Sequence, residues 1–296
     1  MPTVPSHAAK LQIIRARNLV RLRWLVHGFS TRRGGVSTAY GRPSLNLGST
    51  PEDTHRNVER NRRLFAEAIG ASKMKMVAVR QVHSDIIHRV EAAPREPLAG
   101  DGLITQTPGL LLTIRTADCY PVILADPCRR VVGVFHAGWR GTLARIVEKG
   151  VGEMRRHFRT EPSDILAAIG PGIGACCYKV GEEVREKFLA RFPYAEQLFH
   201  TTEEYDEVKL KYPMLFLTQR APGHSHELFP KAIHLNLALA NRLQLIDCGV
   251  PEANIFTSGA CTSCQTRRFF SHRAEKGVTG RMIAAVGIPK PKSTGR

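Results

Sequence analysis

The stretch that decides the fold is Val131–Gly141, which reads VVGVFHAGWRG. Its first five residues form a short apolar run of the kind that makes a buried strand. His136 ends this run, and the glycine-rich residues that follow lead into a helical pattern. A strand, a glycine-rich turn and a helix in this order are typical of α/β proteins, which place ligands at such junctions. The stretch therefore predicts an α/β fold with a ligand site beside His136.

Strand-like and helix-like patterns alternate along the rest of the chain. The strand-like runs are Lys75–Val82, Ile86–Val90, Gly109–Arg115, Pro121–Ala125, Val131–Phe135, Ile165–Ile169, Ile255–Thr257, Phe269–His272 and Met282–Val286, and the helical patterns are His55–Ile69, Thr142–Phe158, Glu182–Phe192 and His234–Cys248. This alternation predicts a single layered α/β domain with a mixed β-sheet flanked by helices. We place this domain at residues 23–288, after an N-terminal extension at 1–22 and before a flexible tail at 289–296. The least periodic stretch, His200–Lys231, is expected to be a long surface segment.

The composition indicates a globular protein. A length of 296 residues with 43% hydrophobic residues is enough to bury a large core. The longest apolar candidate, Leu110–Ala125, is interrupted by Arg115 and Asp118 and falls short of the roughly 20 residues that cross a bilayer. The N-terminus does not read as a secretory signal, so we expect a soluble, cytoplasmic protein. The seven cysteines are odd in number and irregularly spaced, which argues against a disulfide framework.

The net charge of +17 restricts the partners. A strongly basic chain suits either nucleic acid or small anionic substrates. The arginines and lysines are spread along the sequence, and no helix-turn-helix, zinc-finger or RNA-binding signature accompanies them. Nucleic acid is therefore an unlikely partner, and a phosphate-bearing substrate is easier to accommodate.

Three short segments each offer one good metal ligand. They contribute His83 in RQVHS, Cys119 in TADCYP and His136 in VFHAG, each beside an apolar run. Two imidazoles and one thiolate form a three-ligand zinc set that leaves a fourth coordination position open, as catalytic zinc sites do. Taken singly, a histidine at a strand end is commonly structural and a buried cysteine commonly a small hydrophobic residue. The spacing matches no local zinc finger, so only the fold could bring the three together.

Other polar residues near these segments allow more than one interpretation. Asp118 could act as a base, orient a ligand or cap a turn. Arg140 could hold a phosphate or carboxylate at the start of a helix, or pair with a surface carboxylate. Cys261 and Cys264 form a CxxC motif, but no second pair completes a structural zinc site, and the proline of the nucleobase-deaminase signature is missing.

Longer stretches resemble one known family, the YfiH-like proteins, once called polyphenol-oxidase or laccase-domain proteins. The matching stretches are HGFSTRRGGVS, SLNLG, RQVHS, GDGLIT, TADCYPVILAD, GVFHAGWRGT, IGPGIGACCYKVG and FFSHRAEKGVTGRMIAAVGI, which run in this order from His27 to Ile288. The resemblance places His83, Cys119 and His136 on the zinc positions of the family. It also implies an α/β domain similar to the catalytic domain of certain cysteine deamidase toxins.

The resemblance implies a function as well. Its members are regarded as purine nucleoside phosphorylases that act on adenosine, inosine and 5'-methylthioadenosine with phosphate, and that also deaminate adenosine. On this basis we expect Asp118 to transfer a proton or orient a ligand. We expect Arg32 or Arg140 to hold phosphate, and Asn46 and Gln81 to recognise the substrate.

Three alternatives stay open. The first is a cysteine amidase in which Cys119 is the nucleophile and His136 the base. The second is the copper-dependent polyphenol oxidation of the older family name. Multicopper oxidases use several H-x-H motifs, however, and this chain has only His224-Ser225-His226, so copper is less favoured than zinc. The third is a basic nucleic-acid-binding protein, which strongly salt-dependent binding would reveal.

Overall fold

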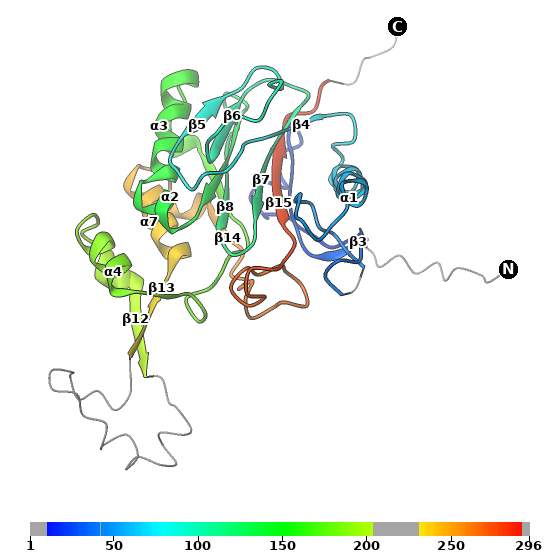
Figure 1. Ribbon diagram of the computed structural model, residues 1–296. Coiled ribbons are helices and arrows are strands. Elements are labelled where there is room, and N and C mark those ends of the chain that lie inside the picture. Colours follow the sequence, from blue (N-terminus) through cyan, green and yellow to red (C-terminus); the bar gives the residue numbers. More distant parts are fainter. Residues whose placement is uncertain (1–10, 42, 204–230, 292–296) are drawn as a thin grey trace, which may run out of the picture. The chain divides into compact units, whose positions relative to one another are not determined.

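Figure 1 shows a computed structural model of the chain, which describes residues 11–41, 43–203 and 231–291. Two compact units make up the chain. The larger unit consists of Met1–Gly174 and Leu237–Arg296, and the smaller one of Ala175–Asn236. The expected surface segment His200–Lys231 lies mostly outside the described residues.

The larger unit contains two mixed sheets. The five-stranded sheet has the order β1 (Ile13–Ile14), β2 (Val26–Ser30), β15 (Met282–Gly287), β7 (Leu110–Thr116) and β4 (Lys75–Ala78). The six-stranded sheet has the order β14 (Ile255–Thr257), β10 (Leu166–Ile169), β8 (Tyr120–Asp126), β9 (Val131–Ala137), β6 (Gly102–Thr105) and β5 (Ile87–Arg89). The five-stranded sheet is mixed because β4 pairs parallel with β7 while β15 pairs antiparallel with β7. In the six-stranded sheet, the two edge strands are the parallel ones: β14 pairs parallel with β10, and β5 with β6. The short strand β3 (Arg33–Ser37) forms isolated bridges with Ser44.

The main core lies between the two sheets. Successive residues of a strand point to opposite faces, so β7 sends Leu112 inward and Leu111 outward. Leu112 belongs to a buried cluster with Ile123 of β8 and Val134 of β9. Leu111 belongs to a second cluster, together with Phe65 of α1 (His55–Ala68). Each sheet is therefore covered on both faces.

Helices cover the outer faces of the two sheets (Figure 1). On the six-stranded sheet these are α2 (Trp139–Leu143), α3 (Ile146–Phe158) and α7 (Leu237–Asp247), and short 3-10 turns occur at Pro162–Asp164 and Glu252–Asn254. Gly150 of α3 faces the Phe135 ring so closely that a Cβ there would lie 2.6 Å from it. The absence of a side chain at residue 150 thus lets α3 approach the strand that carries His136.

The smaller unit has its own sheet. Its antiparallel strands are β11 (Lys179–Val180), β13 (Lys231–Leu235) and β12 (Phe199–Glu203), accompanied by α4 (Glu182–Leu189) and a 3-10 turn at Ala195–Leu198. The ring of Phe188 on α4 packs edge-on against Phe199 of β12, with their centroids 6.0 Å apart. This contact joins the helix to the sheet within the unit.

The predicted α/β fold with a mixed sheet flanked by helices is confirmed, with differences in detail. The strands form separate sheets instead of one. The predicted helix Thr142–Phe158 is wrong as one element, because Arg145 has φ 65° and separates α2 from α3. The expected helix His234–Cys248 starts only at Leu237, because His234 is in a strand. The expected strand Phe269–His272 consists of turns and bends.

Residues 11–22, the described part of the expected N-terminal extension, contribute two buried residues to the core of the larger unit. β1 pairs with β2, and Ala16 and Leu19 are fully buried in the cluster between the sheets. None of the helices in the described ranges has the length and apolar character needed to cross a membrane.

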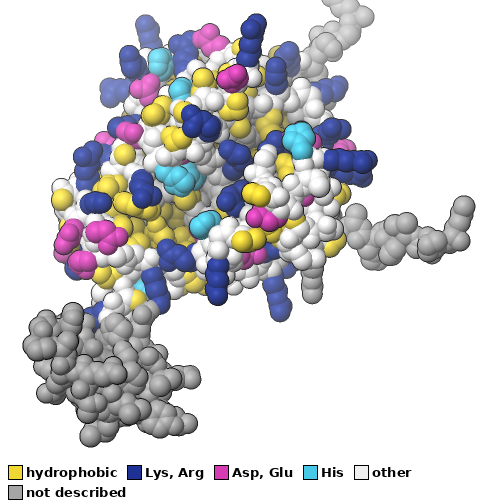
Figure 2. All heavy atoms as spheres, in the orientation of Figure 1, with side chains coloured by type: hydrophobic (Ala, Val, Ile, Leu, Met, Phe, Trp, Pro, Cys, Tyr) yellow, Lys and Arg dark blue, Asp and Glu magenta, His cyan; other side chains and the backbone are white. Residues whose placement is uncertain are grey.

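The positive charges are widely distributed. In Figure 2, lysine and arginine side chains are spread over the visible face, with hydrophobic and acidic side chains between them. They do not gather into one continuous basic surface on this face. A continuous stripe of this kind is the usual electrostatic footprint for nucleic acid.

Candidate metal centre

The three predicted ligands come together where the two sheets adjoin. The ligand atoms of His83, Cys119 and His136 all lie within 4.8 Å of one another. Cys119 lies in the turn where the chain passes from β7 of one sheet to β8 of the other, and His136 is paired with Pro121 in the β8–β9 ladder. The rings of His83 and His136 meet edge to face, with centroids 4.9 Å apart. Residues far apart in sequence thus form one site.

The site opens toward solvent on one side. His136 is only 4% exposed, Cys119 is half-buried, and His83 is exposed. A metal ligand set that is buried at one end and exposed at the other leaves room for a substrate on the exposed side. Catalytic sites differ from closed structural metal sites in this respect.

The surroundings of the three side chains fit a bound cation. A Cβ at Gly138 would lie 3.0 Å from the Cys119 sulfur and 3.2 Å from Cδ2 of His83, so a larger residue there would displace these side chains by a few tenths of an ångström. Two imidazole nitrogens and one thiolate sulfur suit zinc and copper ions. The residues present therefore match a metal of this class.

The Asp101 carboxylate accepts hydrogen bonds from several residues of the site. One carboxylate oxygen accepts hydrogen bonds from Nδ1 of His136 at 2.8 Å and from the backbone N–H of His83 at 3.1 Å. The other oxygen accepts from the backbone N–H groups of Val82 and Ser84 and from the Ser84 hydroxyl. Because Nδ1 of His136 is occupied in this way, its Nε2 is left for the site. A carboxylate of this kind fixes the tautomer and orientation of a metal-binding histidine.

The charges within the site support one another. Burial raises the pKa of the Asp101 carboxyl, but hydrogen bonds from His136 and Ser84 outweigh it and lower the pKa to about 2. Burial also raises the pKa of Cys119, but His136 and His83 bring it below its usual value. Burial lowers the pKa of His136, whereas Cys119 and Asp101 raise it above its usual value by a larger amount. Without a metal, Cys119 and His136 thus favour a thiolate–imidazolium pair, and the thiolate is the form that binds metal or attacks a substrate.

The backbone is strained beside two site residues. His83 has φ 58° and Asp118 has φ 90°, both in the left-handed region that non-glycine residues avoid. The Asp118 carboxylate accepts hydrogen bonds from the Thr262 hydroxyl and the Arg273 N–H, both at 2.7 Å. In this structure Asp118 therefore ties the turn before Cys119 to the 262–273 segment.

Three of the predicted substrate-binding residues make hydrogen bonds within the fold. Arg32 donates to Glu275 at 2.9 Å. The Asn46 side chain is fully buried, donates to an Asp53 oxygen at 2.8 Å and accepts from a backbone N–H at 2.9 Å. Gln81 pairs in both directions with the backbone of Arg115, at 2.8 and 2.9 Å. These contacts give all three side chains a part in the architecture.

Arg140 differs from those three. It lies in α2, two residues after Gly138, and its side chain is exposed. Its guanidinium stacks on the Trp139 ring, 4.4 Å from the centroid, and makes no hydrogen bond to another described residue. Of the two expected phosphate ligands, Arg140 is thus the one that is exposed and not hydrogen-bonded to another described residue, and it follows His136 by four residues in the sequence.

Sequence reasoning missed two contributors, Asp101 and Gly138. Asp101 stands in the stretch GDGLIT, where an acidic residue directly precedes an apolar strand. Its partner His136 lies 35 residues away, and the two meet only because β6 pairs with β9. Gly138 belongs to the glycine-rich turn after His136, but its closeness to the ligands appears only in three dimensions.

The fold and the site together define an α/β protein with a candidate metal centre of two histidines and one cysteine that opens to solvent. The chain belongs to the family described as multi-copper polyphenol oxidoreductase laccase, which it matches over residues 26–289. This confirms the resemblance to YfiH-like proteins.

Named relatives cover nearly the whole chain. It is 36% identical over 285 residues to a purine nucleoside phosphorylase of Deinococcus radiodurans, covering 96% of this chain and 95% of that protein. It is 35% identical over 271 residues to the purine nucleoside phosphorylase YlmD of Geobacillus stearothermophilus, covering 88% and 89%. It is 32% identical over 271 residues to the adenosine deaminase RL5 of an unknown prokaryotic organism, covering 88% and 92%. The crystal structure of YlmD from Geobacillus stearothermophilus superposes with a TM-score of 0.76 at 33% identity, covering 95% of this chain and 97% of that one.

Proposed function

We propose that this chain is a zinc-dependent purine nucleoside phosphorylase that acts on adenosine, inosine and 5'-methylthioadenosine and also deaminates adenosine. The observation that carries the proposal is the convergence of His83, Cys119 and His136 within 4.8 Å at a site open to solvent. The names of the relatives support the reaction class, since several are purine nucleoside phosphorylases and one is an adenosine deaminase.

The residues at the proposed zinc site would have different roles. Bound by His83, Cys119 and His136, zinc would supply a Lewis acid for the purine and lower the pKa of an attacking water. Asp101 keeps His136 in the tautomer that binds metal, through their 2.8 Å hydrogen bond.

Two further residues take proposed roles beside the ligands. Arg140 would hold the phosphate, because its guanidinium is exposed close to the ligands in the chain. Asp118 would position Cys119 through its hydrogen bonds to Thr262 and Arg273. It would hold or move a proton only after one of those bonds is released. Arg32, Asn46 and Gln81 would then shape the surrounding structure instead of touching the substrate.

The test is incubation with adenosine, with and without phosphate, followed by separation of the products. Adenine and ribose 1-phosphate, formed only with phosphate, would show phosphorolysis, and inosine would show deamination. Single variants His83→Ala, Cys119→Ala and His136→Ala should lose zinc and turnover together. Cys248→Ala, at a half-buried thiol just after α7 that belongs to no candidate metal-binding group among the described residues, is the matched control. Full zinc content and full turnover in all three ligand variants would refute the proposal.

A second candidate function is a cysteine amidase. It is favoured by one observation, the chain of contacts from Cys119 to His136 to Asp101, which resembles a nucleophile, a base and an orienting carboxylate. Metal analysis separates the two functions. A protein purified without zinc, inactivated by thiol alkylation and active on amides would support the amidase. Stoichiometric zinc with nucleoside turnover supports the phosphorylase, and copper with phenol oxidation would support the older family name.

A further inference from the structure

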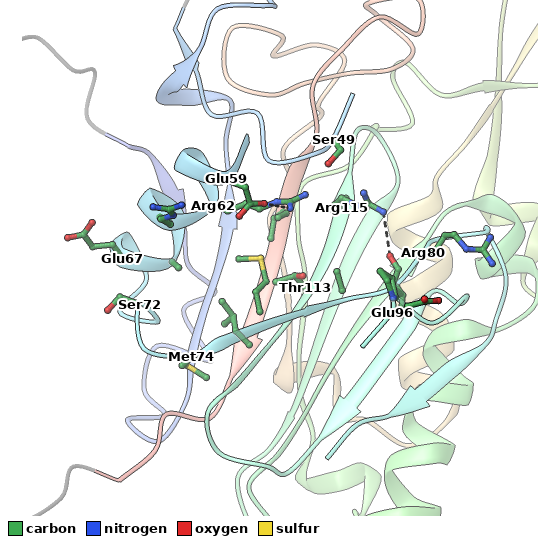
Figure 3. A pocket seen from close by; sticks show the side chains of 18 residues that line it. Ser49, Glu59, Arg62, Glu67, Ser72, Met74, Arg80, Glu96, Thr113 and Arg115 are labelled. Carbon is green, nitrogen blue, oxygen red and sulfur yellow. Dashed lines mark hydrogen bonds and ion pairs between the residues drawn. The ribbon is translucent and has the colours of Figure 1, made fainter. Parts of the chain in front are cut away.

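A groove of about 970 Å³ lies between α1 and the outer face of the five-stranded sheet (Figure 3). Its walls come from α1, β4, β7 and β15, together with the segments around Ser49, Arg80 and Glu96, all within the larger unit. This volume is at the upper end of the roughly 300–1,000 Å³ typical of small-molecule sites. None of the three metal ligands lines the groove.

The floor of the groove is apolar. It includes Met74, Met76, Leu111 and Ile283, which lie on the outer side of the sheet next to α1. Methionine side chains are flexible and polarisable, and they adapt well to flat aromatic rings. The floor therefore suits the ring portion of a small organic ligand.

The centre of the groove is positively charged. Arg115 is partly buried on β7, and among the described residues its side chain makes one hydrogen bond, a long one of 3.4 Å to the carbonyl of Val79. No carboxylate in the described ranges lies within ion-pair distance of it. In Figure 3, Arg62 reaches from α1 toward Arg115.

The neighbouring charges do not neutralise this centre. Burial lowers the pKa of Arg115, and the positive charges of Arg62 and Arg281 lower it further. Within the described ranges, only Arg62 of the three guanidinium groups has a carboxylate partner, Glu59 at 2.7 Å. Arg281 donates to the backbone carbonyls of residues 279 and 280. One carboxylate beside three cations leaves an excess of positive charge in a partly buried place, which favours an anion.

Three carboxylates belong to the lining. Glu59 pairs with Arg62 near the middle of the groove, whereas Figure 3 places Glu67 at the α1 end and Glu96 beside Arg80 at the opposite end. A doubly charged group beside Arg115 would thus meet a cation that has no carboxylate partner in the described ranges, and it would share Arg62 with Glu59. Guanidinium groups bind phosphate oxygens with paired hydrogen bonds, which makes phosphate the best-matched anion.

From this arrangement we propose that the groove is a second ligand site, separate from the metal centre, which binds a small organic phosphate of the nucleoside monophosphate class. The phosphate lies against Arg115 and Arg62, and the ring packs over Met74 and Met76. The proposal does not depend on the reaction at the metal centre.

The test is calorimetric titration of the zinc-loaded protein with adenosine monophosphate, inorganic phosphate and adenosine as separate probes. Arg115→Met should weaken binding of adenosine monophosphate by about 10- to 100-fold, the usual effect of losing charge-assisted hydrogen bonds. Binding of adenosine should not change. His83→Ala, which alters the metal centre, should bind adenosine monophosphate in the groove as tightly as the unaltered chain. If inorganic phosphate binds as tightly as the monophosphate, the site takes free phosphate and the proposed class is wrong.

Two controls protect the interpretation. Arg63→Gln removes an exposed charge from the same helix and the same groove, and should change the affinity by less than about threefold. Arg115→Lys keeps the charge but loses the paired geometry, so it should fall between Arg115→Met and the unaltered chain. If Arg115→Met fails to fold, Arg115→Lys still tests the proposal. Unchanged affinity in both Arg115 variants, or loss of binding in His83→Ala, would overturn the proposal.

Discussion

Replacing Asp101 with asparagine tests whether this carboxylate organises the metal centre. Asparagine keeps one acceptor oxygen, but it places an NH2 group where the carboxylate accepts hydrogen bonds from Val82 and Ser84. Substitution of a residue that orients a metal ligand typically costs 10- to 100-fold in metal affinity, about 1.4–2.7 kcal/mol. The pKa gives a second measure. The difference between 3.8 and about 2, at about 1.36 kcal/mol per pKa unit, corresponds to about 2.4 kcal/mol for the ionised carboxylate. The first magnitude applies to zinc binding, and the second to the stability of the metal-free protein.

Zinc affinity should be measured by competition with a chromophoric chelator at pH 7.5, and stability by denaturant unfolding of the metal-free protein. Asp101→Asn should bind zinc 10- to 100-fold more weakly and unfold with a free energy lower by about 2 kcal/mol. Ser84→Ala is the matched control, because it removes only the hydroxyl donor and keeps the backbone N–H. It should cost about 1 kcal/mol or less. If Asp101→Asn matches the unaltered chain in zinc affinity and stability, the reasoning about Asp101 fails.

Three further predictions concern packing and pH. Gly138→Ala should weaken zinc binding at least about tenfold in the same chelator assay, because its Cβ would crowd two ligand side chains at 3.0 and 3.2 Å; equal affinity would contradict this. Gly150→Ala should destabilise the protein by about 1–3 kcal/mol in denaturant unfolding, because its Cβ would lie 2.6 Å from the Phe135 ring. Gly152→Ala is the control: it has open space around it and should be neutral or stabilising. Burial, and next the charge of a nearby arginine, lower the pKa of His27 to about 4 from 6.5. The unfolded chain therefore binds the proton first, and stability should fall by about 3 kcal/mol as the pH drops from 6.5 to 4. In His27→Gln that part of the pH dependence of unfolding should disappear, and an unchanged pH profile would count against the assignment.

The sequence could indicate that His83, Cys119 and His136 come together, because each stands beside an apolar run and strand ends gather at the edges of sheets. Taken singly each residue is weak evidence, and the family resemblance joined the three; in the structure their ligand atoms lie within 4.8 Å of one another. Asp101 could not be found in this way, since its role depends on the pairing of β6 with β9. The polar groups of Gln81 were also ambiguous, because their partners are backbone atoms 34 residues away.

The sequence did not reveal that the strands form two sheets, for a related reason. The strand β7 reads LLLTIRT, and six of its seven residues are buried, so both of its faces are covered. Leu111 packs under α1 while Leu112 packs between the sheets, so the strand begins with three consecutive leucines instead of an alternation of polar and apolar residues. A strand of this kind indicates burial, but it does not reveal whether a helix or a second sheet covers each face.

The position of the ligands gives the metal centre a mechanical consequence. His83 follows β4 of the five-stranded sheet, and His136 belongs to β9 of the six-stranded sheet. An ion held by both would cross-link the two halves of the sandwich, and sliding of one sheet past the other would pull the ligands apart. Metal occupancy would then be coupled to the docking of the sheets, so that the melting temperature rises with free zinc concentration. Chelation would then loosen the sandwich at the end that carries the three side chains.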